Sequence, residues 1–381
     1  MNNPIIIDIG TKNIRVGYGG EEKPNETLLN LIGRPTTIKM IGVERKDYYA
    51  GSDINFITKR NHRLSLTCPI KRGMVDNWDD MEKILTRTLY YELKISPEEN
   101  EILLTEQPMT SKKDHNKLME IMFETFCTLS VSLMDQSMLS FYSSTTVSSP
   151  FENNSGLVVD IGDSVTNIVP FYNGIPLKEG IIRQEFGGND IVNNLNYHYN
   201  QFSIPMENLY DIKEKFGYVS TMNNNKNSKD NNNNNSYQVS DGQTIQISDS
   251  DRKECGEYLF KPVINCYEVL PSSSSSSSSS PLEAIDSLII KSINNACLSV
   301  NDSYDNIKNK LYNNILLCGG TTNFKGLIER LKSELEKKEE QRSINIKNNY
   351  NDYSSWLGGS KISLNKSNFI SLDSYRENGL E

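Results

Sequence analysis

Residues 156–174 read GLVVDIGDSVTNIVPFYNG, and this stretch decides the fold. An apolar run ends in Asp160 and Gly162, and a second β-rich run follows at residues 166–172. Two apolar, β-branched runs joined by a few turn residues are typical of a β-hairpin. We therefore expect a hairpin whose tight turn carries an acid and a glycine.

The same pattern opens the chain. Residues 4–20 read PIIIDIGTKNIRVGYGG, in which Asp8 and Gly10 follow three isoleucines. A single Asp-x-Gly turn is common in hairpins for conformational reasons alone. Two such turns, each ending a buried strand, indicate a duplicated α/β domain with two phosphate loops.

Composition sets the outer bounds of this interpretation. A chain of 381 residues has room for two domains and a sizeable core. The hydrophobic fraction, 36%, is low for a globular protein. The deficit lies in an Asn-rich tract at residues 222–236 and a serine run at 272–280, which are too polar to pack and are predicted to be exposed loops.

Charge and cysteine usage exclude several classes of protein. A net charge of −9 argues against general affinity for nucleic acid or anionic membranes. No apolar run approaches the roughly 18 residues of a membrane span. The six cysteines and three histidines lack metal-binding spacing, which predicts reduced thiols in a cytoplasmic protein. Cys127 and Cys318 lie in apolar runs and are interpreted as packing residues.

The Ser/Thr-rich linker at 143–155 suggests a domain boundary. The first domain is predicted to comprise residues 1–142 plus 345–381, with a small irregular insert at 33–68. The second is predicted to comprise residues 143–344, with an insert at about 181–260.

Hydrophobic periodicity places the other elements. Helices are expected at 78–92, 112–127, 206–218, 281–300 and 324–337, with another entered at 187–190. Strands are expected at 101–106 and 312–318, a strand followed by a helix at 131–142, a hairpin at 237–247 and a closing element at 355–359.

The two turns suit a nucleotide phosphate. Glycine lets backbone N–H groups approach phosphate oxygens, and carboxylates such as Asp8 and Asp160 hold a divalent cation, often through water. Hydroxyl donors and cations stand nearby at Thr11, Lys12, Arg15, Ser164 and Thr166. A third glycine turn, Gly319-Gly320-Thr321, follows an apolar run and suits a sugar and base. A purely conformational role for the turns remains an alternative at this point.

Several ordered matches show that the sequence resembles the actin superfamily from residue 5 to about 379. The most specific is GMVDNWDDMEKILTRTLYYELKISPEENEILLTE at 73–106. It is joined by MFETF (122–126), DIKEKFGYV (211–219), VSDGQTIQI (239–247), CGGTTNFKG (318–326) and SSWLGGS (354–360).

The resemblance implies an α/β fold of two ribonuclease-H-like domains around a nucleotide cleft, as in actin, hexokinases and heat-shock chaperones, each with an inserted subdomain. It implies ATP or ADP with Mg²⁺, held through water by Asp8 and Asp160. Gln136 matches the glutamine that positions the attacking water, and Asp160 is the second residue assigned to catalysis. The implied nucleotide contacts are Asp8, Gly10, Thr11, Arg15, Gly162, Asp163, Ser164, Val165, Lys213, Glu214, Gly319, Gly320, Thr321 and Phe324.

Departures from the family pattern concern hydrolysis and assembly. Asn167 stands where actins carry a histidine near the attacking water, and Lys12 and Ser164 stand where they carry glycines. These changes predict nucleotide binding with slow hydrolysis, so a weak ATPase is the enzymatic activity to test. The unusual loop at 36–46, the serine run and the C-terminal end of the sequence argue against homopolymerisation as an ordinary filament.

The resulting hypothesis is a divergent actin or actin-related protein of the cytoplasm and cytoskeleton. Its expected partners are actin filaments, actin-binding proteins or a multi-subunit complex. The alternative is a structural subunit of a dynein-activating or chromatin-remodelling assembly, with nucleotide as a fixed stabiliser. A sugar kinase or chaperone ATPase is disfavoured by the dense match at 73–106.

Overall fold

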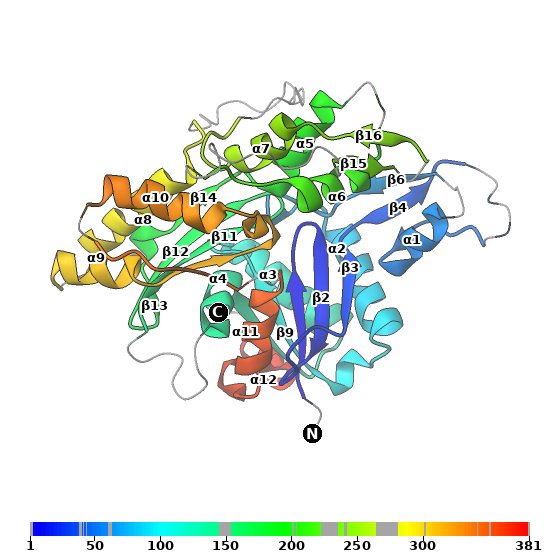
Figure 1. The fold of residues 1–381 in the computed structure, drawn as a ribbon. Helices are drawn as coiled ribbons and strands as arrows, with labels where there is room; N and C mark the ends of the chain where they lie inside the picture. Colours follow the sequence, from blue (N-terminus) through cyan, green and yellow to red (C-terminus); the bar gives the residue numbers. More distant parts are fainter. Residues whose placement is uncertain are drawn as a thin grey trace. The chain divides into compact units, whose positions relative to one another are not determined.

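The computed structural model describes residues 3–37, 40, 42, 44–59, 63–144, 154–199, 202, 204–221, 235–239, 242–263, 281–300, 302–340, 342–349 and 352–379. The chain divides into two compact units (Figure 1). Unit 1 comprises Met1–Pro150 and Tyr353–Glu381, and unit 2 comprises Phe151–Asp352.

Unit 1 is built on a six-stranded sheet with the strand order β19-β10-β9-β1-β2-β3. Strands β1, β9 and β10 run parallel to one another, and the flanking pairs are antiparallel. Strand β1 is buried along its whole length, which is why it reads as a continuous apolar run. The strand bounds are β1 Ile5–Ile9, β2 Asn13–Tyr18, β3 Glu26–Leu29, β9 Glu101–Glu106, β10 Ser130–Asp135 and β19 Ile370–Ser371.

Helices cover this sheet at the positions that periodicity predicts. The predicted helix at 78–92 is confirmed as α2 (Trp78–Thr86) with a π-helical extension, and the one at 112–127 as α3 (Lys112–Glu120) with another. The amide side chain of Asn77 caps α2 by accepting from the backbone N–H of Asp80. The strand-then-helix prediction at 131–142 is confirmed as β10 and α4 (Gln136–Ser143).

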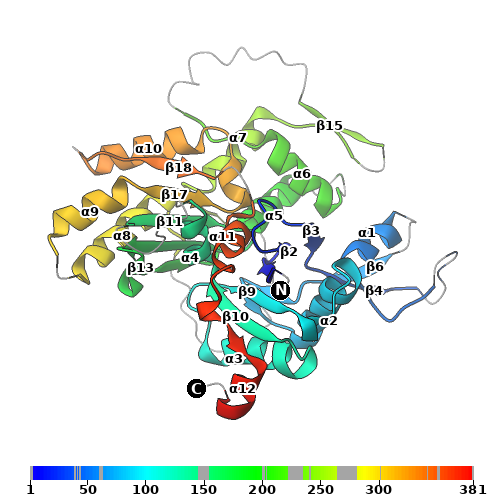
Figure 2. The same cartoon turned by 90° about the horizontal axis from the view of Figure 1, so that it is seen from below.

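The end of the chain completes unit 1. Helix α11 (Ser354–Ile362) places Trp356 in the core, where its indole N–H donates to the carbonyl oxygen of Ile6 at 3.2 Å. Helix α12 (Leu372–Asn378, red in Figure 2) lies beside the segment after α3. There Tyr375 stacks on Phe123 with 4.5 Å between ring centroids.

The segment at 33–68 is more regular than predicted. It contains a three-stranded sheet, β5-β4-β6, and helix α1 (Ser52–Thr58). The bounds are β4 Ile32–Pro35, β5 Tyr49–Ala50 and β6 Leu64–Thr67. Tyr49, Ile54 and Ile57 form a small core of their own with Met40. The prediction of an irregular segment was wrong because these apolar residues are few and separated by polar ones.

Unit 2 repeats the same plan around a second six-stranded sheet. The main order is β13-β12-β11-β17-β18, and β14 pairs with β12. Strands β11, β17 and β18 are parallel to their neighbours in this series. The bounds are β11 Gly156–Ile161, β12 Thr166–Tyr172, β13 Ile175–Pro176, β14 Ile182–Gln184, β17 Ile315–Cys318 and β18 Ile346–Asn348.

The helices of unit 2 are α5 Gly188–His198, α6 Met206–Phe216, α7 Asp249–Glu257, α8 Ile285–Leu298, α9 Tyr304–Tyr312 and α10 Leu327–Lys338. The hairpin predicted at 237–247 is confirmed as β15 (Ser236–Gln238) and β16 (Thr244–Gln246). Helix α9 was missed, and the strand predicted from 312 begins at Ile315, because Tyr312 is the last residue of that helix. The serine run and residues 222–234 lie outside the described residues.

Two cysteines assigned to packing have different surroundings. Cys318 is buried in β17, whereas Cys127 is exposed, with a φ of +50°. The packing role predicted for Cys127 was wrong, because the chain turns sharply at the end of the helical segment and directs this residue outward. Among the described cysteines, all are free thiols.

Candidate nucleotide-binding loops

Asp8 lies at the end of β1, beside the first glycine turn. Its cross-strand partner is Arg15, and the turn is closed by the N–H of Gly10, which donates to the carbonyl oxygen of Asn13 at 3.0 Å. Asp8 is buried, and its carboxylate lies 3.6 Å from the Arg15 guanidinium. Burial of a carboxylate is favourable only when such partners compensate for lost hydration.

Further partners of Asp8 come from the neighbouring parallel strands. The hydroxyl of Thr105 and the amide of Gln136 each donate to Asp8 Oδ1 at 2.9 Å. Thr105 is the second-last residue of β9, and Gln136 directly follows β10. Because the carboxyl ends of parallel strands meet at one edge, the sheet itself brings these three side chains together, at the edge where α/β proteins bind ligands.

Gln136 is held in place by the start of α4. Its predecessor Asp135 caps this helix, with Oδ1 accepting from the N–H groups of Ser137 and Met138 at 2.7 and 3.0 Å. Burial, opposed by these two bonds and reinforced by the negative charge of Glu106, raises the pKa of Asp135 from 3.8 to about 6.

The raised pKa of Asp135 predicts a pH dependence of stability. In the folded state Asp135 binds its proton more tightly than in the unfolded chain. The contribution of this proton to the free energy of unfolding is therefore complete below pH 3.8 and is lost as pH rises through about 6. Asp135→Asn keeps the capping acceptor without the charge. We expect the variant to be more stable than the parent at pH 7.5 by about 1–3 kcal/mol in urea unfolding, with the difference disappearing near pH 4.

The control for this prediction is Asp373→Asn, which removes an exposed acid from the first turn of α12. It should leave the pH profile of the parent unchanged. An Asp135→Asn protein that is less stable than the parent at pH 7.5 would show that the ionised carboxylate is favourable there.

Unit 2 contains the same hairpin geometry. Asp160 is the second-last residue of β11 and lies opposite Asn167, as Asp8 lies opposite Arg15. The N–H of Gly162 donates to the carbonyl oxygen of Val165 at 3.0 Å. Asp160 is half-buried, while Ser164 and Val165 are buried. Two turns with the same closing bond and the same placement of the acid are therefore built in two separate units.

The third glycine turn approaches Asp160 closely. Gly319 has a φ of +85°, and a Cβ atom there would lie 2.4 Å from the Ile161 carbonyl oxygen and 2.5 Å from Asp160 Oδ1. Only glycine fits both the backbone conformation and this approach. The strand register explains the position, because Asp160 pairs with Cys318 in parallel β17.

The start of α5 brings further predicted residues to the same place. The N–H of Gly188 and the hydroxyl of Thr321 both donate to the Gly162 carbonyl oxygen at 3.0 Å. A Cβ atom on Gly188 would lie 2.6 Å from Thr321 Oγ1 and 2.7 Å from Lys213 Nζ. Gly162, Thr321 and Lys213 thus converge around a bare glycine backbone.

The remaining predicted residues lie at different depths. Phe324 is buried and Gly320 is exposed, and Glu214 lies on the exposed side of α6 next to buried Lys213. In unit 1, Thr11 is half-buried, and its carbonyl oxygen accepts from the Cys68 thiol at 3.3 Å.

Sequence reasoning missed several residues of these loops. Thr105 and Gln107 lie where β9 ends, and only the register of the parallel strands places them near Asp8 and Gln136. Tyr210, whose hydroxyl donates to Asp163 Oδ1 at 3.0 Å, comes from a helix with no signal beyond its own periodicity. Arg183 lies opposite Asn167 in β14, where burial lowers the pKa of its guanidinium.

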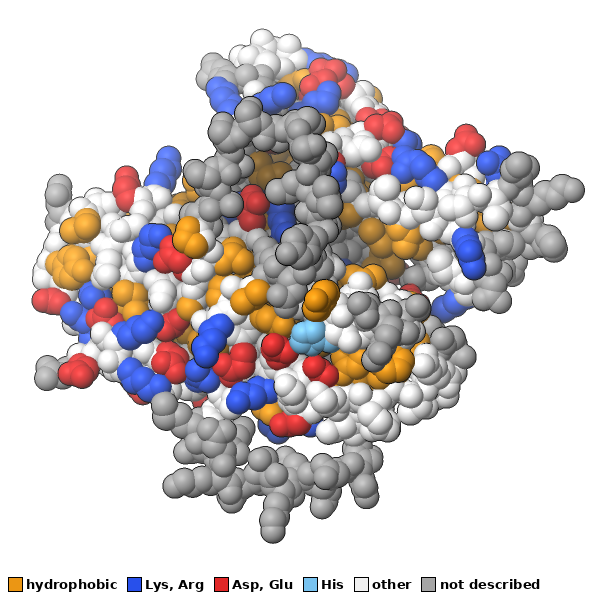
Figure 3. All heavy atoms as spheres, turned by 90° about the horizontal axis from the view of Figure 1, so that it is seen from above, with side chains coloured by type: hydrophobic (Ala, Val, Ile, Leu, Met, Phe, Trp, Pro, Cys, Tyr) orange, Lys and Arg blue, Asp and Glu red, His pale blue; other side chains and the backbone are white. Residues whose placement is uncertain are grey.

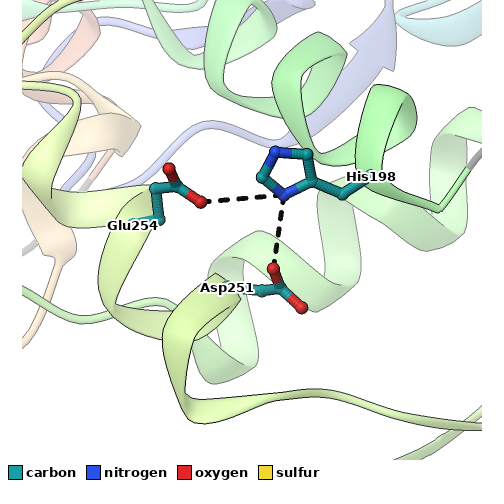
Figure 4. Close-up of side chains that lie close together, drawn as sticks. All are labelled: His198, Asp251 and Glu254. Atoms are coloured by element: carbon teal, nitrogen blue, oxygen red, sulfur yellow. Dashed lines mark hydrogen bonds and ion pairs between the residues drawn. The ribbon is translucent and has the colours of Figure 1, made fainter.

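A separate polar cluster joins α5 to α7 in unit 2. Figure 4 shows His198 pointing toward Asp251 and Glu254, with Nδ1 at 3.3 and 3.6 Å from their carboxylate oxygens. The three ligand atoms lie within 4.8 Å of one another, although the sequence spacing gave no hint of this. Asp251 also accepts from Tyr199 and Ser248, and all three side chains of the cluster are partly exposed, so we interpret it as a structural hydrogen-bonding cluster.

Charges of both signs are mixed on the surface. Figure 3 shows Lys and Arg side chains interspersed with Asp and Glu over the described part of the face that it draws. Around α8, α9 and α10, ion pairs join Lys338 to Asp286 at 2.7 Å and Arg342 to Asp305 at 2.8 Å. Among the described residues, no helix is long and apolar enough to cross a membrane.

The loops fit a Mg²⁺-nucleotide chemically. Each unit presents one aspartate beside a glycine turn, and carboxylate oxygens are the ligands that Mg²⁺ prefers. Glycine backbones at 10, 188 and 319 leave space where a side chain would collide with neighbouring atoms. Arg15 supplies a positive charge beside the first loop in unit 1, and Lys213 supplies one beside Gly188 in unit 2.

This fold and these paired loops define an α/β protein of the actin class. The family model described as Actin matches residues 1–209 and 192–381, which together span the chain. A Dictyostelium discoideum protein named "Putative actin-29" is 34% identical over 401 aligned residues, covering 99% of this chain and 95% of that protein. The chain belongs to the actin family, which confirms the resemblance and the predicted fold class.

Proposed function

We propose that this chain binds ATP or ADP with Mg²⁺ through both Asp-Gly hairpins. Support comes chiefly from one observation, the construction of the same turn twice at the carboxyl ends of parallel strands. The proposed phosphate contacts are Asp8, Gly10, Thr11, Arg15, Gly162, Asp163, Ser164 and Val165. The proposed nucleoside contacts are Lys213, Glu214, Gly319, Gly320, Thr321 and Phe324.

The chemical group of each side chain suggests its role in the proposed site. Asp8 and Asp160 would hold the metal through water, and the amide of Gln136 would orient the attacking water. When bound, Mg²⁺ offsets the negative charge of the phosphates. Within unit 1 the Arg15 guanidinium lies 3.6 Å from the Asp8 carboxylate and offsets the cost of burying it.

We propose that hydrolysis is slow. Asn167 is almost completely buried opposite Asp160, at the position where the family resemblance places a histidine. An amide does not accept a proton near neutral pH, whereas an imidazole does. The Asn167 side chain can form hydrogen bonds as a histidine does, but it cannot take up a proton. This difference supports nucleotide binding more strongly than nucleotide hydrolysis.

We further propose a cytoplasmic role in or beside the cytoskeleton, with actin filaments, actin-binding proteins or a multi-subunit complex as partners. This rests on family membership. Sedimentation under polymerising salt and co-purification separate the two forms of the proposal. Incorporation into filaments supports the actin role, and stoichiometric non-actin partners support a structural subunit.

Nucleotide binding is tested by a pair of glycine variants. Gly319→Ala strains a positive φ and meets Ile161 and Asp160, whereas a Cβ atom on Gly242, which also has a positive φ, meets nothing within 4 Å. Both substitutions carry the cost of a left-handed non-glycine residue, about 1–2 kcal/mol, and only Gly319→Ala adds a collision at the proposed contacts. We expect the parent and Gly242→Ala to retain nucleotide on purification, measured by chromatography, and Gly319→Ala to lose it.

Two results would contradict the proposal. A parent protein that purifies without nucleotide and binds none on addition of Mg-ATP would exclude it directly. Equal retention by the two glycine variants would show that this turn does not contribute to the site.

A further inference from the structure

Gln107 contacts the proposed water-orienting residue. It directly follows β9, as Gln136 directly follows the neighbouring parallel strand β10, so the two amides emerge side by side. The amide nitrogen of Gln107 donates to Gln136 Oε1 in a short hydrogen bond. Neither glutamine has a sequence signal that predicts this contact.

The orientation of the Gln136 amide is fixed by its other partners. Its nitrogen lies 2.9 Å from Asp8 Oδ1, 3.0 Å from the carbonyl oxygen of Ile9 and 3.0 Å from Thr105 Oγ1. A carboxylate and a carbonyl oxygen can only accept, so the group facing them must be the NH₂. The oxygen of Gln136 therefore faces Gln107.

The Thr105 hydroxyl strengthens this assignment. It donates to Asp8 at 2.9 Å and accepts from the N–H of Ile9 at 2.9 Å, which leaves one further acceptor position for Gln136. A hydroxyl has one donor and two acceptor positions, and the two hydrogens of the Gln136 NH₂ are shared among this oxygen, Asp8 and Ile9. The network has a single consistent direction, from Gln107 through Gln136 to Asp8.

The loop that carries Gln107 is itself rigid. The carbonyl oxygen of Gln107 accepts from the N–H of Thr110 at 3.2 Å and from its hydroxyl at 2.7 Å. Met109, between them, has a φ of +64°, which marks a tight turn. Gln107 is half-buried, so its bond to Gln136 is partly shielded from water.

We propose that Gln107 is a positioning residue that restrains hydrolysis by holding the Gln136 oxygen. This inference rests on the proposed function, in which Gln136 orients water. Hydrolysis forms a bond from the water oxygen to the terminal phosphorus and breaks the bond to the bridging oxygen, which leaves with its electron pair on ADP. One water proton remains on phosphate and the other passes to solvent. The Gln136 oxygen must accept a hydrogen bond from that water, and Gln107 already occupies one of its two acceptor positions and fixes its direction.

The test uses Gln107→Met, which keeps the length of the side chain and removes the donor. Single-turnover hydrolysis of bound ATP should rise about fivefold, corresponding to about 1 kcal/mol, the usual net contribution of one neutral hydrogen bond. Nucleotide retention should stay at the parent level. In a Gln136→Met background, Gln107→Met should have no effect on hydrolysis, because the inferred action passes through Gln136.

A second readout is independent of activity. Urea unfolding of the parent, the two single variants and the double variant measures the coupling between Gln107 and Gln136, which should be clearly nonzero. Ser111→Ala is the matched control, because it removes the capping hydroxyl of α3 near Gln107 and costs about as much stability without contacting Gln136. Its hydrolysis rate should equal that of the parent.

Each outcome separates the two proposals. A parent that binds no nucleotide overturns the proposed function and this inference with it. Retained nucleotide with zero coupling overturns the contact between the two amides. The last case is a protein that retains nucleotide and shows nonzero coupling. If hydrolysis by Gln107→Met is then unchanged or slower than in the parent, Gln107 does not restrain hydrolysis. An equal rise in rate in Ser111→Ala leads to the same conclusion.

Discussion

Replacement of Asp8 with asparagine is expected to abolish nucleotide retention and to destabilise unit 1 by about 3 kcal/mol. The carboxylate is buried against Arg15, whose side chain is only 11% exposed, and it accepts from Thr105 and Gln136. The asparagine amide can replace the acceptor at Oδ1 but presents an NH₂ to the guanidinium. The variant therefore loses the metal-directed charge and the ion pair between this position and Arg15.

The control is Asp76→Asn, the same substitution in an exposed ion pair. Asp76 lies 2.6 Å from Lys71, and the two side chains are 50% and 71% exposed. Such pairs contribute about 0–1 kcal/mol, so this variant should unfold close to the parent in urea and retain nucleotide. Asp8→Asn protein that purifies with the parental amount of nucleotide would remove Asp8 from the proposed site.

Replacement of Gly358 with alanine is expected to prevent stable packing of α11 on α4. A Cβ atom at this position would lie 1.8 Å from the carbonyl oxygen of Leu139 and 2.5 Å from its carbonyl carbon. These are backbone atoms inside a helix, so the two helices must separate. We expect a loss of about 3 kcal/mol or more, seen as a large drop in the urea midpoint or as insoluble protein.

The neighbouring residue provides the control for this prediction. A Cβ atom on Gly359 would meet the Ile6 side chain at 3.0 Å, and a methyl group can shift by a few tenths of an ångström. Gly359→Ala should therefore cost about 1 kcal/mol. Equal stability of the two variants would show that α11 and α4 are not held at this spacing in solution.

The parts of the fold that could be predicted are those with strong local signals. Strands β1, β9 and β11 are continuous apolar runs with turn residues at their ends, and α2 and α3 have clear helical periodicity and capping residues. Helix α9 was missed because three of its residues are charged and its apolar positions are few. The segment at 33–68 was underestimated for the same reason. The predicted domain bounds remain predictions.

The candidate site was predictable only where a residue has its own sequence signal. Asp8, Asp160 and Gly319 stand at strand ends beside glycines, so they could be named at once. Thr105 and Gln107 have no such signal, because their position depends on the register between β9 and its neighbours. The environment of Asn167 likewise comes from its cross-strand partners, Asp160 and Arg183, rather than from adjacent residues.

The way unit 1 is assembled affects how the chain can fold during synthesis. Its sheet and core use both Met1–Pro150 and Tyr353–Glu381, whereas unit 2 is a single continuous stretch. Trp356 and Gly358 reach β1 and α4 only after the whole of unit 2 has been translated, and β19 pairs with β10 later still. The contacts of α11 with β1 and α4 therefore form only after the last segment has been synthesised. Apolar surface that is exposed in the meantime makes folding intermediates prone to aggregation.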